Sequence, residues 1–343
     1  MKHLRLLAVL AATIMFATAC TGGGGSPSAD EESEAPASQA AESEAAESRA
    51  AEMPEELVIG FVPSREADAL VDTIQPVADA LEEALGIPVE GIVSTDYTGL
   101  VTAMETDQAQ IGAFGPFSLL QARDRAGAEI ILQSERFGSA TYHTQFMTNN
   151  PDKYCDDEPV EIEDGWLNCN GTADADTGPV GLEKVAEIEE GTPFSFVEQA
   201  SASGYIFPAT ILSDQGIDYE TGIEPIFAGG HDTSVVAVCE GDAEVGVAFD
   251  DARGAAETDC DVASNVVVFA YGPEIPNDGW AVSGDLPDEL KEQIKQALLD
   301  YAATEEGQAT LEAIYEITGL VEADQEAFTI VEDAAAELGV EGD

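Results

Sequence analysis

Short apolar runs alternate along the chain with segments in which apolar residues recur at helical spacing. The short runs predict buried strands, and the spaced positions predict amphipathic helices. In the first part of the chain the predicted strands are 57–62, 88–93, 111–114 and 129–132. The helices predicted between them are 70–85, 95–104 and 115–126. Strands that alternate with helices in this way predict an α/β lobe with a mainly parallel sheet.

The same alternation returns later in the chain and predicts a second α/β lobe. Its predicted strands and helices are 193–196, 201–212, 224–228, 231–239 and 245–249. We expect lobe 1 to comprise 57–147 and 270–343, and lobe 2 to comprise 148–269. The chain would cross twice between the lobes, so segments 144–148 and 267–271 form the predicted hinge.

The N-terminus has the pattern of an export signal. Three of the first five residues are basic, Lys2, His3 and Arg5, and 6–16 is an apolar run too short to span a bilayer as a mature helix. The residues that follow, 17–20, are small and end at Cys20, which resembles a bacterial lipobox. The leucine usual three positions before the cysteine is Ala17 here. We therefore expect lipidation of Cys20, and ordinary signal-peptide cleavage is the alternative.

A segment rich in Gly, Ser, Ala and Glu, 21–56, separates this signal from the first predicted strand. It lacks the apolar residues that would offset the entropy of ordering, so we expect an acidic, disordered linker. No later segment is apolar for long enough to span a membrane. The layout predicts a lipoprotein held by its lipid anchor alone at the outer face of the cytoplasmic membrane.

Four further cysteines follow: Cys155, Cys169, Cys239 and Cys260. An even number in an exported chain favours disulfides, and three pairings are possible. We expect the local pairing, Cys155–Cys169 with Cys239–Cys260, which closes two short loops. The first loop lies in an irregular acidic stretch, 149–177, interpreted as a surface insertion. Zinc binding is the alternative, but the sequence has no Cys-x-x-Cys and its histidines lack ligand spacing.

The net charge of the chain limits the kinds of molecule that it can bind. The chain carries 12 Lys and Arg against 69 Asp and Glu, a net charge of −57. Nucleic acids need clustered cations, so a nucleic-acid partner is excluded, and so is electrostatic binding to anionic lipid. The acidic residues are spread through every segment, which suggests a surface adapted to high salt.

One stretch has the composition of an anion site. Ser201, Ser203 and Gly204 lie in a turn that opens an apolar helical run to Leu212. The first amides of a helix have no intrahelical partner, and the helix dipole adds partial positive charge there. The serine hydroxyls would supply further donors. An ordinary serine N-cap is the alternative interpretation of the same residues.

Polar residues also follow several other predicted strands. In open parallel sheets such strand-end loops cluster at one edge, where ligands bind. Two facing lobes would bring both sets together across a cleft. The residues concerned are Ser64, Tyr97, Phe117, Ser118, 201–204, His231 and Asp250.

These motifs occur in the order of a known family. They are 61–68, 95–99, 115–118, Ser201–Tyr205 with Pro208, 229–232 and Asp250–Asp251. Over about 57–325 the chain resembles the phosphate, phosphite and phosphonate substrate-binding proteins of ABC transporters, the PhnD type. The resemblance implies a two-lobed periplasmic-binding-protein fold, type II-like, whose lobes close on a ligand by a hinge. It also implies delivery of the ligand to an ABC permease with a cytoplasmic ATPase.

Carried over to this chain, the resemblance implies a role for each motif. Ser201–Gly204 and His231 would hold the phosphorus oxyanion, and Tyr97 would close on it from the other lobe. Phe117 and Ser118 would line the pocket. Either Asp250 or Asp251 would orient the far side of the ligand, with Asp250 the expected residue.

One departure leaves the ligand open. Ala202 stands where a Thr or Ser hydroxyl is common in the family, which removes a possible donor. Phosphonate, phosphite and phosphate all remain as ligands. Arg65 and Arg136 could approach the cleft, but we interpret them as surface ion pairs.

Two other functions are compatible with the residue types. Ser, His and Asp in one site could serve an exported hydrolase, although the turn 200–204 is not a Gly-x-Ser-x-Gly elbow. A sensor lipoprotein could use the same fold for another small anion. We expect a monomeric binding protein with no enzymatic activity, no cofactor and no metal.

Overall fold

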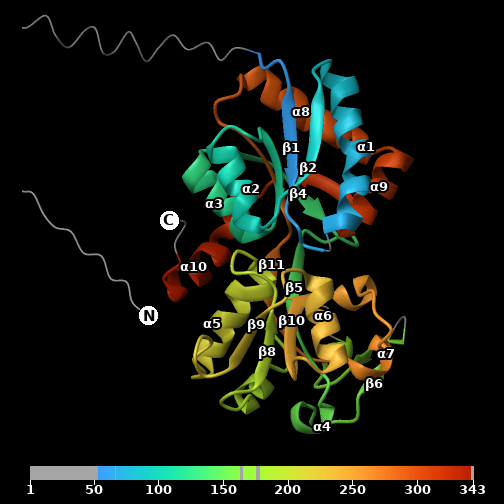
Figure 1. The fold of residues 1–343 in the computed structure, drawn as a ribbon, viewed down its shortest axis with the longest axis vertical. Coiled ribbons are helices and arrows are strands. Elements are labelled where there is room, and N and C mark those ends of the chain that lie inside the picture. The colour runs from blue at the N-terminus through green and yellow to red at the C-terminus, as the bar shows by residue number, and fades with distance from the viewer. Residues whose placement is uncertain (1–52, 66, 163–164, 175–177, 341–343) are drawn as a thin grey trace, which may run out of the picture. The chain divides into compact units, whose positions relative to one another are not determined.

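A computed structural model describes residues 53–340, except 66, 163–164 and 175–177. The predicted signal peptide, Cys20 and nearly all of the predicted linker therefore lie outside the described residues. The described part belongs to a single compact unit that contains two sheets, each flanked by helices (Figure 1).

Six strands form the first sheet, in the order β13-β4-β12-β3-β1-β2. Their bounds are β1 (Leu57–Phe61), β2 (Val89–Val93), β3 (Ile111–Phe114), β4 (Glu129–Glu135), β12 (Gly279–Val282) and β13 (Gly319–Glu322). β1 runs parallel to both β2 and β3, whereas β12 is antiparallel to β3 and β4. The predicted parallel α/β core is confirmed, and the two added strands come from the C-terminal part of the chain.

The first three helices of the first lobe alternate with strands β1 to β4 as predicted, and three further helices come from the C-terminal part of the chain. They are α1 (Ala67–Leu85), α2 (Tyr97–Glu105), α3 (Pro116–Ala126), α8 (Asp288–Ala302), α9 (Glu305–Tyr315) and α10 (Thr329–Leu338), with a short turn η6 (Gln325–Phe328). α10 packs against both α3 and α5 of the second lobe. The C-terminal helix therefore contacts both lobes.

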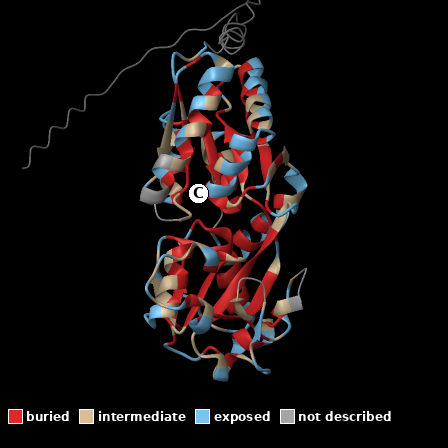
Figure 2. Ribbon diagram, turned by 90° about the vertical axis from the view of Figure 1, so that its right-hand side faces the viewer, coloured by how far each residue is buried: buried red, intermediate tan, exposed pale blue. Residues whose placement is uncertain are grey.

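Seven strands form the second sheet, in the order β6-β7-β11-β5-β10-β8-β9. Their bounds are β5 (Thr141–Thr148), β6 (Val160–Glu161), β7 (Leu167–Asn168), β8 (Pro193–Phe196), β9 (Glu224–Phe227), β10 (Val245–Phe249) and β11 (Val267–Pro276). The helical segments are α4 (Pro151–Tyr154), η2 (Thr172–Asp174), η3 (Leu182–Glu187), η4 (Ala202–Ile206), α5 (Phe207–Asp214), α6 (His231–Glu240), η5 (Ala252–Ala255) and α7 (Val262–Asn265). Buried residues fill the interior of each lobe (Figure 2).

The chain crosses between the sheets at other residues than the sequence predicts. β5 and β11 pair along their whole lengths and lie entirely in the second sheet. The predicted lobe borders at 147/148 and 269/270 fall inside these strands and are corrected to 136–140 and 277–278. Apolar patterning could not show this, because a strand at a lobe border looks the same whichever sheet it joins. The Asn277 amide donates to the Ala140 carbonyl over 2.8 Å, so the two crossing segments are hydrogen-bonded to each other.

Both predicted disulfides are present. The Cα atoms are 5.7 Å apart in Cys155–Cys169 and 6.1 Å apart in Cys239–Cys260. The stretch around the first disulfide is more than the predicted surface insertion, because β7 extends the sheet beside β11. Tyr154 stacks on the Phe269 ring at 5.0 Å and is fully buried. Within the described residues no group of ligand-type side chains could hold a metal ion, and no helix is long and apolar enough to cross a bilayer.

Candidate functional site

A small cavity of about 20 Å³ lies where the two lobes meet. The first lobe contributes loops at the carboxyl ends of β1, β2 and β3, and the second contributes the ends of β8, β9 and β10. The two crossing segments complete the wall. The lining residues are Val62, Ser64, Tyr97, Gly115, Pro116, Arg136, Tyr142, Ser201, Ala202, Ser203, His231, Phe249 and Asp278.

The turn that opens α5 supplies one wall of this cavity. The Ser201 hydroxyl accepts from the Gly204 amide at 3.1 Å, which is the predicted N-cap. The Ile206 amide then donates to the Ser201 carbonyl five residues earlier, so the first turn is wider than an α-helical turn. A Cβ on Gly204 would lie 2.4 Å from Val197, so this close packing requires glycine.

The first residues of this wide turn line the cavity. The amides of Ala202 and Ser203 lie ahead of any intrahelical acceptor, as at every helix start. The Ser203 carbonyl is held from behind by the Thr144 hydroxyl, which donates to it over 2.6 Å. Since Ala202 contributes its backbone rather than a hydroxyl, its replacement of a family serine or threonine removes one side-chain donor only.

His231 opens α6 and presents a single N–H. Its Nδ1 accepts from the Phe249 amide at 3.1 Å, so in the neutral ring the proton is on Nε2. Nε2 lies 3.4 Å from the Ser201 hydroxyl oxygen. Burial, and then the positive charges of Arg136 and Arg65, lower the pKa of His231 to about 3. The free site therefore holds a neutral imidazole that donates through Nε2.

The backbone of His231 also joins the lobes. Its amide donates to the Ser64 carbonyl, from the first lobe, over 3.0 Å. Two tyrosines face the same space: Tyr97 at the start of α2 and Tyr142 on β5. Burial raises the pKa of both phenols, which therefore remain protonated donors at neutral pH.

An ion pair contributes the only formal charges among the residues that line the cavity in the described part of the chain. The Arg136 Nη2 lies 2.9 Å from the Asp278 Oδ2, and the two side chains are only 7% and 14% exposed. The predicted surface ion pair for Arg136 is thus wrong, because the guanidinium is enclosed between the lobes. It stands over the rings of Phe249 and Tyr142, at 5.0 and 5.5 Å. Arg65 instead pairs with Glu316 at 3.1 Å, outside the cavity lining.

Four of the nine predicted ligand-binding residues do not line the cavity: Phe117, Ser118, Gly204 and Asp250. Phe117 and Ser118 follow Gly115 and Pro116, whose atoms form that wall instead. The Ser118 hydroxyl is buried and donates back to the Gly115 carbonyl at 3.1 Å. Gly204 lies one residue beyond Ser203 and shapes the turn from behind. Sequence spacing located the loops correctly but could not tell which residue of each loop faces inward.

Asp250 also lies outside the lining, and its carboxylate has other partners. Oδ1 accepts from the His143 amide at 2.7 Å, and Oδ2 lies 3.0 Å from the His143 Nδ1. The His143 Nε2 in turn accepts from the Gly178 amide at 2.9 Å, which assigns the ring proton to Nδ1 and makes Nδ1 the donor to Asp250. The predicted orienting carboxylate therefore holds the His143 ring on β5, and that ring in turn accepts from the loop before η3.

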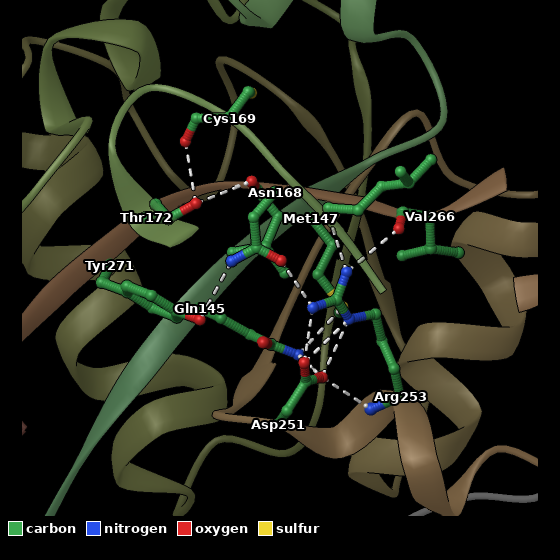
Figure 3. Close-up of polar contacts among 11 residues, drawn as sticks. Gln145, Met147, Asn168, Cys169, Thr172, Asp251, Arg253, Val266 and Tyr271 are labelled. Atoms are coloured by element: carbon green, nitrogen blue, oxygen red, sulfur yellow. Dashed lines mark hydrogen bonds and ion pairs between the residues drawn. The ribbon is translucent and has the colours of Figure 1, made fainter. Parts of the chain in front are cut away.

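Asp251 is committed to a separate buried network (Figure 3). The Arg253 side chain donates to both carboxylate oxygens of Asp251, at 2.5 to 3.0 Å. Its remaining N–H groups donate to the Leu167 carbonyl, the Val266 carbonyl and the Asn168 side chain. Neither residue of the predicted Asp250–Asp251 pair is available to a ligand in the cavity.

The carboxylate that does line the cavity, Asp278, is not among the residues predicted from the sequence. Asp278 follows β11 and precedes β12, a strand that the apolar pattern did not reveal. The Asn277-Asp278-Gly279 triplet is a turn signal, and such a turn beside a strand border was the available indication. Tyr142 and Arg136 carried no comparable local signal, because both gain their role from packing between the lobes.

A known family matches most of the chain. The profile of the family described as "ABC transporter, phosphonate, periplasmic substrate-binding protein" matches residues 59–328. Among curated proteins, the "Phosphate-import protein PhnD" of Mycolicibacterium smegmatis is 26% identical over 261 residues, which cover 72% of this chain and 66% of that protein. The "Probable ABC transporter phosphite binding protein PhnD1" of Prochlorococcus marinus is 20% identical over 292 residues, covering 83% and 90%.

Solved structures share the fold. PhnD1 from Prochlorococcus marinus in complex with methylphosphonate superposes with a TM-score of 0.68 at 19% identity, covering 84% of this chain and 100% of that one. A binding protein component of an ABC phosphonate transporter from Pseudomonas aeruginosa gives 0.66 at 18% identity, covering 82% and 86%. These similarities support the two-lobed α/β architecture described above.

Proposed function

The chain belongs to the family of ABC-transporter phosphonate periplasmic substrate-binding proteins, and on that premise we propose that its interlobe cavity binds a small phosphorus oxyanion. The observation that carries the proposal is the set of inward donors on both lobes. On the second lobe these are the first amides of η4, the Ser203 hydroxyl and the His231 Nε2–H. On the first lobe Tyr97 faces them across the cavity. Phosphate, phosphite and phosphonate all present oxygens to such donors.

The charge of the chain makes this local arrangement necessary. A net charge of −57 repels an anionic ligand at long range. Buried hydroxyls, amides and one imidazole offset that repulsion at close range, where the local dielectric is low. The Arg136 guanidinium adds a permanent positive charge at the same cavity. Binding thus depends on preorganised short-range contacts rather than on steering by the surface.

The lobes would close on the ligand by a hinge at the crossing segments. The bond from the His231 amide to the Ser64 carbonyl joins loops of opposite lobes directly beside the cavity. An open state would break this bond and expose the donors to the ligand. This is the hinge-closure class of motion, displaced along the chain from the predicted segments 144–148 and 267–271 to the crossings at 136–140 and 277–278.

The geometry gives no support to a hydrolase built on these serine, histidine and aspartate residues. A triad needs a carboxylate on the ring nitrogen opposite the nucleophile. The His231 Nδ1 instead accepts from a backbone amide, and Asp250 is paired with His143. We therefore propose that the protein delivers its ligand without chemistry, to an ABC permease driven by a cytoplasmic ATPase.

We also propose that the mature chain acts as a monomer tethered through a lipid on Cys20. The sequence around Cys20 supports the tether, and the acidic linker would let the binding domain reach the permease. Metabolic labelling with an alkyne fatty acid would test it. Label that persists in Cys20→Ser would contradict the anchor.

Calorimetric titration of the purified protein with phosphate, phosphite and methylphosphonate tests the binding function. At least one of the three is expected to bind with a 1:1 stoichiometry. The Ser203→Ala variant should weaken that binding, whereas Ser264→Ala, which changes a serine on α7 remote from the cavity, should not. Failure of all three anions to bind would overturn the proposed function.

A further inference from the structure

Two adjacent residues of the first lobe, Ser64 and Arg65, contact the second lobe at separate points. The Ser64 carbonyl accepts from the His231 amide at 3.0 Å, and the Arg65 Cα lies 3.7 Å from the position that a Cβ on Gly230 would occupy. The Arg65 guanidinium carbon stands over the ring of Phe249, 5.9 Å from its centre. The loop that follows β1 therefore contacts both the start of α6 and the end of β10.

Phe249 is the residue of the second lobe that receives the guanidinium. It is the last residue of β10, and its side chain is buried and lines the cavity. Its amide donates to the His231 Nδ1 and its ring lies 4.8 Å from the imidazole, so Phe249 sets both the tautomer and the packing of that ring. A second guanidinium, that of Arg136, stands over the same ring at 5.0 Å. The face of an aromatic ring attracts cations, more strongly where water is excluded.

The first lobe orients Arg65 for this contact. The Arg65 Nη2 lies 3.1 Å from Oε1 of Glu316, the residue that caps α9. The neighbouring Tyr315 hydroxyl donates to the Val62 carbonyl, which ties the end of α9 to the loop that carries Arg65. The Arg65 Nε is buried and makes no hydrogen bond with any described residue. The ion pair with Glu316 and the contact with the Phe249 ring are therefore the interactions that hold the guanidinium.

We propose that Arg65 is a positioning residue for lobe closure: its guanidinium, held by Glu316, binds the Phe249 ring of the opposite lobe and stabilises the closed state in which His231 faces the ligand. We call Arg65, Glu316 and Phe249 the interlobe clasp. The inference rests on the proposed function and adds to it a residue outside the cavity lining. Opening the hinge would separate Arg65 from Phe249, whereas the pair with Glu316 lies within the first lobe and would persist.

A contact that exists only in the closed state raises affinity without touching the ligand. The apparent dissociation constant is the intrinsic constant divided by the fraction of protein in the binding-competent state, so an interaction that favours closure lowers it. The strength of a cation–π contact corresponds to a change of about threefold to thirtyfold in an equilibrium constant. The clasp therefore predicts a measurable share of the affinity at a residue that does not line the cavity.

Calorimetric titration with phosphate, phosphite and methylphosphonate tests the clasp. Arg65→Met keeps an unbranched apolar side chain but removes the cation. It should weaken the binding of every anion that the unmodified protein binds, by about threefold to thirtyfold. Arg65→Lys keeps a cation and should recover most of the affinity. The matched control is Arg125→Met, which breaks an ion pair with Glu105 at 3.0 Å within the first lobe and should change affinity by less than about twofold.

Two further variants distinguish the clasp from electrostatic attraction between Arg65 and the anion. Glu316→Gln removes the carboxylate that orients Arg65. The clasp predicts weaker binding in this variant, whereas electrostatic attraction predicts tighter binding because a negative charge is lost. In Phe249→Leu the ring is absent, so the addition of Arg65→Met should change affinity by less than about twofold. An Arg65→Met effect of the same size in both backgrounds would overturn the inference.

The outcomes separate the clasp from the proposed function. If the unmodified protein binds none of the three anions, the proposed function is overturned, and the clasp with it. If it binds an anion and Arg65→Met leaves that affinity unchanged, only the clasp is overturned, and tighter binding by Glu316→Gln has the same consequence. If Phe249→Leu does not fold, the variants at Arg65 and Glu316 still decide the question, because neither residue lines the cavity.

Discussion

Two buried arginine–aspartate pairs in this protein have opposite surroundings. In the network behind β5 and β11, every N–H of the Arg253 guanidinium has an acceptor, and the side chain is fully enclosed. In the cavity, the Arg136 Nε has no partner among the residues that the structure describes, and Asp278 uses one carboxylate oxygen. Arg136 and Asp278 are 142 positions apart, whereas Arg253 and Asp251 are two positions apart. Only the cavity pair leaves capacity for another molecule.

Whether all hydrogen-bonding groups of a pair are satisfied distinguishes a pair that stabilises the fold from a pair in a binding site. A charge taken out of water needs its hydrogen bonds satisfied, and the Arg253 network does so with protein groups alone. Incomplete satisfaction is costly in a core but useful in a site, where a ligand completes it. Net charge does not make this distinction, since each pair is neutral overall. The state of the remaining donors and acceptors does.

The largest expected effect tests the framework pair. Arg253→Leu leaves Asp251, Asn168 and two carbonyls without their donor, and should lower the free energy of unfolding by about 3–5 kcal/mol. Denaturant titration followed by circular dichroism measures it. Arg136→Leu should lower the free energy of unfolding less, because Asp278 faces a cavity and can take up a proton. It should abolish tight anion binding, because it removes the positive charge at the cavity. Equal destabilisation by the two variants would contradict the comparison.

The second prediction concerns acid. His231 has a pKa lowered to about 3 in the free folded state against 6.5 for the ordinary group, so the folded state resists its protonation. Its contribution is fully present above pH 6.5 and is lost as the pH falls toward 3. At about 1.4 kcal/mol per pKa unit, the loss approaches about 5 kcal/mol.

Parallel unfolding curves across this range, without ligand, test it. The difference in stability between the unmodified protein and His231→Gln should shrink, or reverse in sign, as the pH falls from 6.5 toward 3. A constant difference would show that His231 titrates alike in both states.

The third prediction separates the two buried histidines by binding. His231→Ala removes the Nε2–H that faces the cavity and should weaken oxyanion binding by about 1.5–3 kcal/mol. His143→Ala removes the partner of Asp250 outside the lining and should affect stability more than affinity. Calorimetry and thermal unfolding on both variants give the two readouts. An unchanged affinity in His231→Ala would remove this residue from the site.

The smallest predicted effect compares two helix caps. Ser201 accepts from the Gly204 amide at the cavity, and Thr304 accepts from the Gly307 amide at the start of α9. Ser201→Ala and Thr304→Ala should each lower stability by about 1 kcal/mol. Only Ser201→Ala should also weaken anion binding, since its hydroxyl lines the cavity. Equal binding by both variants would reduce Ser201 to a structural cap.

Much of the fold could be predicted because it depends on local patterning. The parallel strands of the first lobe, the helices α1 to α3 and the strand–helix units of the second lobe all follow from apolar spacing. β12 and β13 were missed because both are short, and their pairing partner β4 is distant in the sequence. The pairing of the cysteines followed from short loop closure, which the chain itself limits.

In the candidate site, too, the residues with a local sequence signal could be predicted, and those placed by contacts between distant segments could not. The turn at Ser201, the start of α6 at His231 and the start of α2 at Tyr97 carry local signals, and all three line the cavity. Asp250 also lies at a strand end, but its side chain does not line the cavity. Its carboxylate instead makes two contacts to His143 on the neighbouring strand. A strand-end position predicts which loop reaches the cleft, but not which way a side chain points.

The sequence by itself determined the α/β class, the family and the loops that face the cleft, and it favoured the local disulfide pairing that the structure shows. These follow from periodicity, turn residues and motif order, which are properties of neighbouring positions. Only the tertiary structure decided that Arg136 and Asp278 meet, since 142 positions separate them along the chain. It also decided that Asp250 and Asp251 are occupied elsewhere. The role of each charged group depends on how far it is buried and on which hydrogen-bonding partners surround it. Both are fixed only when the two lobes are assembled.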